Sequence, residues 1–186
     1  MAAATQSMGR DLTSLALVLA LVAGGLRLLD TLPQRLAELT EYRGGRPFAQ
    51  ISEVERRLGE RLALPAYFPQ TLRWPPARIR VAGARPAQVL LAFDAATGSG
   101  ERLLFAQSVG GVEEPTAPLW PDGVLLDSAG VGLQQTTGVL ERLLAPDGRI
   151  WHQVRWERWG RLLVLRSAGG PEELMTLARS VRREGP

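Results

Sequence analysis

The sequence contains one histidine, His152, and no cysteine. A histidine beside a serine and a carboxylate can carry out nucleophilic hydrolysis, and the candidate nucleophiles are Ser108, Ser128 and Ser167. None of the three lies in the Gly-x-Ser-x-Gly turn that exposes the nucleophile of an α/β-hydrolase. His152 falls in the middle of a strand-like run, which favours a partly buried structural histidine. We therefore expect no catalytic residues and no enzymatic activity.

The acidic residues and glycines do not form a recognisable cofactor motif. Glu113 and Glu114 are adjacent, and Asp122 and Asp127 follow, but their spacing matches no calcium loop and favours a solvated loop. One histidine without cysteine cannot hold a transition metal unless carboxylates help. The glycines at 98–100 and 130–132 lack the other residues of phosphate-binding loops. We predict no metal and no cofactor.

The basic residues are all arginine, and the formal net charge is +3. Such a composition suits phosphates or anionic lipid. However, no more than two arginines are adjacent, and acidic residues are interspersed with them. This pattern favours solvated surfaces, and we predict no nucleic-acid partner.

The longest apolar run, residues 12–26, has no charge between Asp11 and Arg27. As a helix it is about 22 Å long, and about 27 Å if extended through Leu29, against a hydrocarbon core of about 30 Å. Leucines continue at helical spacing beyond it, which favours an uncleaved anchor. The prediction is a tail and transmembrane helix over residues 1–29, then a juxtamembrane helix and linker over 30–47. A cleaved signal peptide, cut near residues 22–24, is the alternative.

The orientation of such an anchor is ambiguous from charge. Arg10 precedes the run, whereas four arginines, at positions 27, 35, 43 and 46, follow it. The positive-inside rule would therefore place the C-terminal domain in the cytoplasm. The rule weakens for long translocated domains, so charge alone leaves both orientations open.

The remaining residues, 48–186, are expected to form one α+β domain. A Ser-x-x-Glu capping box at 52–55 predicts a helix to about residue 63, and Gly-Gly-Pro at 169–171 predicts the start of another. Between them, apolar runs separated by turn residues predict about six antiparallel strands. This order indicates an antiparallel sheet with helices packed on one side.

Several short motifs follow one another in a recognisable order. They are Ser-Glu-Val at 52–54, Leu-Pro-Ala-Tyr-Phe-Pro at 64–69, the apolar run 89–93, Trp156 with the apolar run 163–165, Glu-Glu-Leu at 172–174 and Ala-Arg-Ser at 178–180. Over about residues 50–182 this order resembles a bacterial family of uncharacterised extracytoplasmic domains. Members of that family are often tethered by one membrane helix, and some look distantly like lipoprotein-carrier or sigma-factor regulatory periplasmic domains. The arginine content and the Trp-Pro-Pro at 74–76 depart from the pattern.

The resemblance implies a domain outside the cytoplasm and no catalytic residues. It therefore favours the extracytoplasmic orientation, against the arginine count. The predicted location is the cell membrane, with a single pass and the C-terminal domain extracytoplasmic.

Five tryptophans are many for a chain in which aromatic residues make up 6%. Trp74 and Trp120 lie in proline-rich loops, where they could anchor a partner or pack into the core. We predict Trp74, Trp120 and Tyr67 as partner-binding residues.

These observations predict a membrane-anchored, non-enzymatic protein-interaction domain, as an accessory subunit of a membrane complex or a regulatory module. Its partners would be membrane lipid, through the N-terminal helix, and another membrane or extracytoplasmic protein. The alternative is a carrier of lipid or another hydrophobic ligand, with an apolar cavity between sheet and helices.

Overall fold

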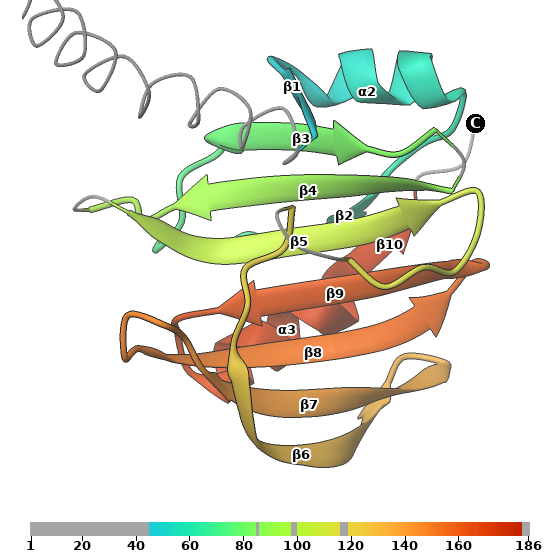
Figure 1. The fold of residues 1–186 in the computed structure, drawn as a ribbon. Helices are drawn as coiled ribbons and strands as arrows, with labels where there is room; N and C mark the ends of the chain where they lie inside the picture. Colours follow the sequence, from blue (N-terminus) through green and yellow to red (C-terminus); the bar gives the residue numbers. More distant parts are fainter. Residues whose placement is uncertain (1–44, 85, 98–99, 116–118, 184–186) are drawn as a thin grey trace, which may run out of the picture. The chain divides into compact units, whose positions relative to one another are not determined.

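The computed structural model describes residues 45–84, 86–97, 100–115 and 119–183, which all belong to one unit, Arg43–Pro186. An eight-stranded antiparallel sheet dominates it (Figure 1), in the order β1-β3-β4-β5-β9-β8-β7-β6. Its strands are β1 (Arg46–Phe48), β3 (Arg78–Ala82), β4 (Ala87–Asp94), β5 (Glu101–Val109), β6 (Val124–Leu133), β7 (Thr136–Leu144), β8 (Ile150–Arg158) and β9 (Arg161–Ser167). A small second sheet pairs β2 (Ala63–Pro65) with β10 (Val181–Arg183), and the helices are α2 (Ile51–Leu58) and α3 (Pro171–Ser180).

Tight turns connect the strands in the second half of the chain. The turn between β7 and β8 contains Gly148 at a φ of 79°, and Ala145 donates to the carbonyl of Arg149 across it at 2.9 Å. The turn between β8 and β9 is Trp159-Gly160, and both residues have positive φ. Two successive positive φ values match the twist of the flanking strands, which is why such turns close hairpins.

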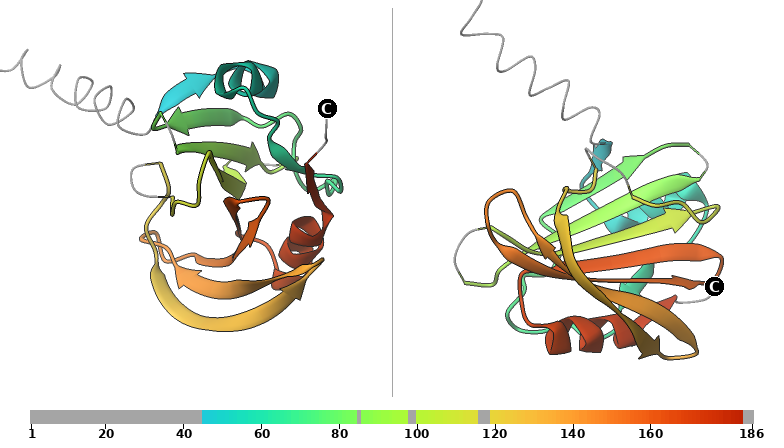
Figure 2. Two further views of the ribbon diagram at one scale, coloured as in Figure 1. Left: turned by 90° about the vertical axis from the view of Figure 1, so that its right-hand side faces the viewer. Right: turned by 60° about the horizontal axis from the view of Figure 1, so that its bottom comes forward.

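The strands at the centre of the sheet are buried on both faces. One face, called here the helix face, carries Phe93, Phe105 and Leu165 and packs against Leu174 and Leu177 of α3. Figure 2 shows α3 running beneath the strands. Burial on both faces explains why β4, β5 and β9 are nearly continuous apolar runs.

The opposite face, called here the loop face, has a smaller apolar cluster. Leu104, Ala106 and Val164 project from β5 and β9 and pack against Leu119 and Trp120, which belong to the connection between β5 and β6. In Figure 1 this connection crosses in front of the sheet. A loop therefore covers the loop face of the sheet, whereas helices cover the helix face.

A buried arginine attaches the chain after α2 to the end of the sheet. Arg161, in β9, is 2% exposed and donates from Nη1 to the carbonyl of Arg61 at 3.0 Å. Its other amino group contacts the Glu60 carboxylate. Burial lowers the pKa of Arg161, and the hydrogen bond to Glu60 opposes that shift. The guanidinium thus satisfies groups that the core would otherwise leave unpaired.

Gln107 completes this attachment. Its side-chain amide accepts from the backbone N–H of Ala63 at 2.9 Å and donates to the carbonyl of the same residue at 3.0 Å. Arg161 also donates to the Gln107 oxygen at 3.3 Å. Gln107 therefore bonds the backbone of β2 as a neighbouring strand would.

The predicted fold class is wrong. The described residues are 51% strand and 14% helix, so they form a large antiparallel sheet with two short helices, not an α+β fold with a transmembrane helix. The additional strands include β1, β2 and β10, which have three residues each and are too short to show alternation, and β6, whose first seven residues are all exposed.

The helix predicted for residues 52–63 is shorter than expected. Gln50 is the N-cap residue, with no side-chain cap, and Gly59 ends α2 at a φ of 70°. Glu55 does not close a capping box, because its carboxylate accepts from the backbone of Leu62 at 2.9 Å and from Arg61 at 3.0 Å. The helix predicted to open at Pro171 is confirmed as α3.

Within the described ranges, neither helix combines the length and the hydropathy that crossing a bilayer requires. The predicted span at residues 12–26 and the juxtamembrane helix lie outside those ranges.

We predict that Arg161→Met destabilises the domain by about 2–4 kcal/mol, because it removes the buried donor to the Arg61 carbonyl and leaves the Glu60 carboxylate with only its longer contact to Arg183. Urea unfolding measures this change. Arg182→Met, at an exposed position of β10, is the control and is expected to change stability by less than about 0.5 kcal/mol. Equal stability of the two variants would contradict the role given to Arg161.

Candidate interaction surface

Two of the three predicted partner-binding residues lie in the connection between β2 and β3. Tyr67 is 46% exposed and Trp74 is 53% exposed. They belong to residues 67–74, called here the aromatic segment, which also contains Phe68. Large aromatic side chains exposed this far are the usual anchors of protein interfaces.

Trp74 is held against the core by ring contacts. Its ring stacks on that of Phe93 with centroids 6.0 Å apart and an angle of 23° between the planes. Phe68 meets it edge-on at 5.4 Å. Phe93 is fully buried, so one face of the Trp74 ring rests on the core while more than half of the side chain stays accessible.

Backbone hydrogen bonds fix the aromatic segment on both sides of Trp74. Arg73 donates to the carbonyl of Asp94 at 2.9 Å, and Ala77 donates to that of Ala92 at 2.9 Å. Proline at positions 69, 75 and 76 restricts the backbone further. Trp74 is therefore presented from an ordered connection tied to the end of β4.

A side-chain contact joins the same segment to α3. Thr71 donates from its hydroxyl to a carboxylate oxygen of Glu173 at 2.9 Å. Nearby, Ala66 donates from its backbone to the carbonyl of Ser180 at 3.0 Å. The aromatic segment is thus attached both to the sheet and to the helix.

The third predicted residue, Trp120, lies on the loop face and is only 6% exposed. Its Nε1 donates to Gln153 at 3.2 Å, and the guanidinium of Arg166 lies 4.7 Å from its ring centroid. Trp120 is therefore used inside the fold, and the structure does not bring it together with Tyr67 or Trp74.

Trp120 covers a row of buried polar side chains that face one another on β7, β8 and β9. Glu141 pairs in register with Gln153, which pairs with Arg166. Gln153 donates to Glu141 at 2.7 Å and accepts from Nε of Arg166 at 2.9 Å. Burial lowers the pKa of Arg166 to about 10, opposed by the charges of Glu141 and Asp122. Because a pKa of about 10 leaves the guanidinium charged at neutral pH, this row is a stabilising network.

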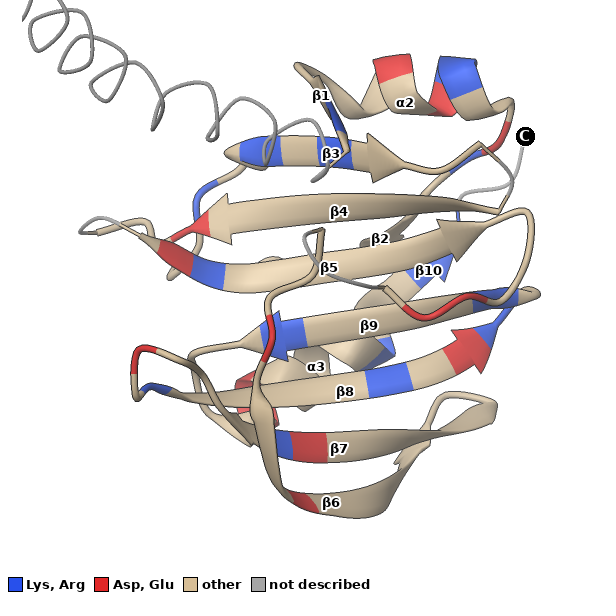
Figure 3. Ribbon diagram, in the orientation of Figure 1, with Lys and Arg blue, Asp and Glu red and all other residues tan. Residues whose placement is uncertain are grey.

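Two of the four acidic residues noted in the sequence, Glu114 and Asp127, pair with arginines. Glu114 contacts Arg155 at 3.1 Å, and Asp127 contacts Arg142 at 2.8 Å. Acidic and basic residues are interspersed over the described strands (Figure 3). Among the described residues, no three His, Asp or Glu side chains gather as a metal site would require.

His152 lies opposite Ser167 in the register of β8 and β9. Its Nδ1 is 2.9 Å from the carbonyl of Gly169, and the Ser167 hydroxyl accepts from the backbone of Gly169 at 2.9 Å. Both side chains therefore engage the backbone just before α3. This arrangement positions the start of the helix.

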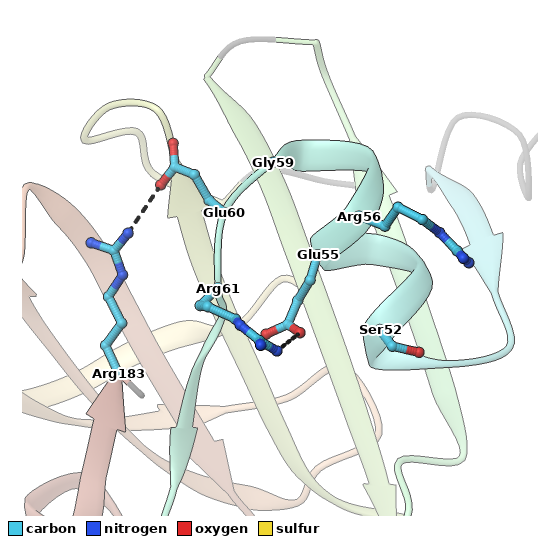
Figure 4. A pocket seen from close by; sticks show the side chains of 7 residues that line it. All are labelled: Ser52, Glu55, Arg56, Gly59, Glu60, Arg61 and Arg183. Carbon is cyan, nitrogen blue, oxygen red and sulfur yellow. Dashed lines mark hydrogen bonds and ion pairs between the residues drawn. The ribbon is translucent and has the colours of Figure 1, made fainter. Parts of the chain in front are cut away.

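Sequence reasoning missed a pocket of about 500 Å³ beside α2, lined by Ser52, Glu55, Arg56, Gly59, Glu60, Arg61 and Arg183. In Figure 4 four of its charged side chains form two pairs, Arg61 with Glu55 at 3.0 Å and Arg183 with Glu60 at 3.7 Å. The pocket brings together residues from both ends of the domain. No sequence motif signals it, because each of its charged residues, taken alone, looks like an ordinary surface charge.

Comparisons with protein-family models, with curated proteins and with solved structures find no match to this chain. The resemblance to an extracytoplasmic family therefore stays a prediction. The fold and the surface define the described part as an antiparallel sheet domain with an ordered, exposed aromatic segment.

We predict that the two loop tryptophans differ in their contribution to stability. Trp120→Ala should cost about 3–5 kcal/mol, because it opens the loop-face cluster and removes the donor to Gln153. Trp74→Ala should cost about 1–2 kcal/mol, because the side chain is half exposed and loses mainly its ring contacts. Chemical denaturation of the two variants measures the difference, and equal losses would contradict it.

Proposed function

We propose that this domain is a non-enzymatic protein-interaction domain whose contact surface is the aromatic segment. The observation that carries the proposal is Trp74, which is 53% exposed although stacking on Phe93 holds it in place. An aromatic anchor that is ordered before binding loses little conformational entropy when it is buried by a partner. Tyr67 adds a second accessible aromatic side chain with a hydroxyl.

The non-enzymatic part of the proposal is supported by how the polar residues are used. Glu141, Gln153 and Arg166 bond to one another, and His152 bonds to a backbone carbonyl. An active site needs groups aimed at a substrate. These groups instead bond to other groups of the same domain.

The biological role that we propose is that of an accessory subunit of a membrane complex or a regulatory module. It is supported by the resemblance over residues 50–182, which favours a partner among extracytoplasmic or membrane proteins. The extracytoplasmic location rests on the same resemblance. The aromatic segment supports binding of a protein irrespective of how the chain is localised.

Affinity purification of the tagged full chain from its native host tests this function. Trp74→Ala is expected to lower recovery of the partner by about tenfold or more, since a tryptophan anchor contributes at least about 2 kcal/mol. Tyr67→Ala should cause a smaller loss. The readout is quantitative mass spectrometry of the co-purified proteins.

Trp159→Ala is the matched control. Trp159 is also exposed, but it lies in the turn between β8 and β9 beside Arg158, away from the aromatic segment in the chain. Its removal should leave recovery of the partner unchanged. Full recovery with Trp74→Ala, or no enriched protein with the unmodified chain, would refute the proposal.

The second candidate function is a carrier of a hydrophobic ligand. A pocket of about 280 Å³ on the loop face favours it, because Leu104, Leu143 and Trp151 form apolar walls beside charged residues such as Asp122 and Arg166. On the helix face, where the cavity was expected, α3 packs onto the sheet through the buried side chains of Leu174 and Leu177. The pocket is slightly below the usual range of about 300–1,000 Å³, so it suits a small apolar molecule better than a lipid.

Native mass spectrometry of the full chain tests the carrier function. A carrier should retain a small apolar molecule, and Leu143→Trp should expel it by filling the pocket. Leu140→Met, at a position on the helix face, keeps the pocket and should keep the ligand. A spectrum with only the unliganded mass for the unmodified chain would reject this function.

A further inference from the structure

The two edges of the large sheet are built differently. The β1 edge has only three residues, one of which is Pro47, so it offers few backbone groups for pairing. The β6 edge has ten residues and no proline, lysine or arginine. Among the described edge strands, β6 is therefore the long one, and it lacks the proline and the basic residues that commonly hinder strand pairing.

The first half of β6 also exposes apolar side chains. Val124 is 65% exposed, and Leu125 and Leu126 are about half exposed. Leu126 falls at a register irregularity between β6 and β7, and Ile150, two strands away in β8, is exposed as well. Exposed apolar side chains beside unpaired backbone groups are typical of a surface that is covered by a partner.

We propose that a second copy of this chain covers this edge, with its β6 strand paired antiparallel to the first. A second copy supplies an edge of the same length and the same apolar character, so one contact covers both exposed strands. The proposal goes beyond the interaction function, because it uses a different surface from the aromatic segment.

The faces of the sheet restrict the register. A two-fold axis perpendicular to the sheet leaves each side chain on its own face, so only residues of one face can lie opposite one another. Leu126 has no partner of its own in the register of β6 with β7 and is counted here as an extra residue. When the two β6 strands then pair over their full length, Ala129 lies opposite Ala129 of the other copy. Val124 then lies opposite Leu133, and Ser128 lies opposite Gly130.

This register is compatible with the side chains of β6. Ser128, Ala129 and Gly130 at its centre are small and allow two backbones to approach. Asp127 is the one charged residue of the strand, and Arg142 of its own chain neutralises it at 2.8 Å. The two Asp127 residues would lie about 13 Å apart along the strands, beyond the Debye length of about 8 Å.

The absence of cysteine from the chain allows a specific cross-linking test on the full-length protein. In Ala129→Cys the two thiols should form an intermolecular disulfide under mild oxidation, because the Cα atoms of directly opposed residues are about 4.5–5.5 Å apart. In Ser128→Cys the two Cα atoms should be about 8 Å apart, beyond the disulfide limit of about 6.8 Å. We expect a covalent dimer for Ala129→Cys and mostly monomer for Ser128→Cys.

Light scattering of the unmodified full-length chain over a range of concentrations gives an independent measurement. It should show a reversible dimer, and Ala129→Lys should weaken dimerisation by about tenfold or more, because it places two like charges opposite each other. Ser52→Lys, on the exposed side of α2, should have no effect, and circular dichroism checks that each variant folds. A monomer at all concentrations, or equal cross-linking at 128 and 129, would overturn the proposal.

Discussion

The central strands of this domain must be covered on both faces, and the rest of the structure follows from that requirement. Strands β4, β5 and β9 place apolar side chains on each side of the sheet. Antiparallel sheets commonly leave one face in water, where polar residues alternate with apolar ones. Because this sheet does not, each face needs its own cover, although helix makes up only 14% of the described residues.

The two faces are covered by different kinds of secondary structure. On the helix face, α3 supplies an apolar side, and Gln107 and Arg161 attach the chain that follows α2. On the loop face, the β5–β6 connection supplies Leu119 and Trp120, and the row of Glu141, Gln153 and Arg166 anchors Trp120. A loop can act as a core element here because each polar group beneath it has a partner, which removes the cost of burying it.

The sequence-based predictions succeeded where local patterns decide the structure, and they failed where contacts between distant residues decide it. The strands on either side of the 146–148 turn, and the helix beginning at Pro171, follow from local patterns and were predicted. Trp120 was predicted to bind a partner because it lies among prolines, as Trp74 does. What separates the two is the surface beneath each ring: Gln153 and Arg166 bury Trp120, whereas Phe93 leaves one side of Trp74 accessible. Those neighbours are distant in the sequence, so composition cannot reveal them.

The same reasoning accounts for the edges of the sheet. A sheet that is covered on both faces still ends in two edge strands. Whether the outer backbone groups of an edge strand are paired depends on what lies next to that strand. At β1 the strand is short and Pro47 removes a donor, so little is left to pair. At β6 ten residues remain, and apolar side chains accompany them. Covering the faces therefore leaves the backbone groups of the long β6 edge without a strand partner. In the proposed dimer, β6 of a second copy supplies that partner.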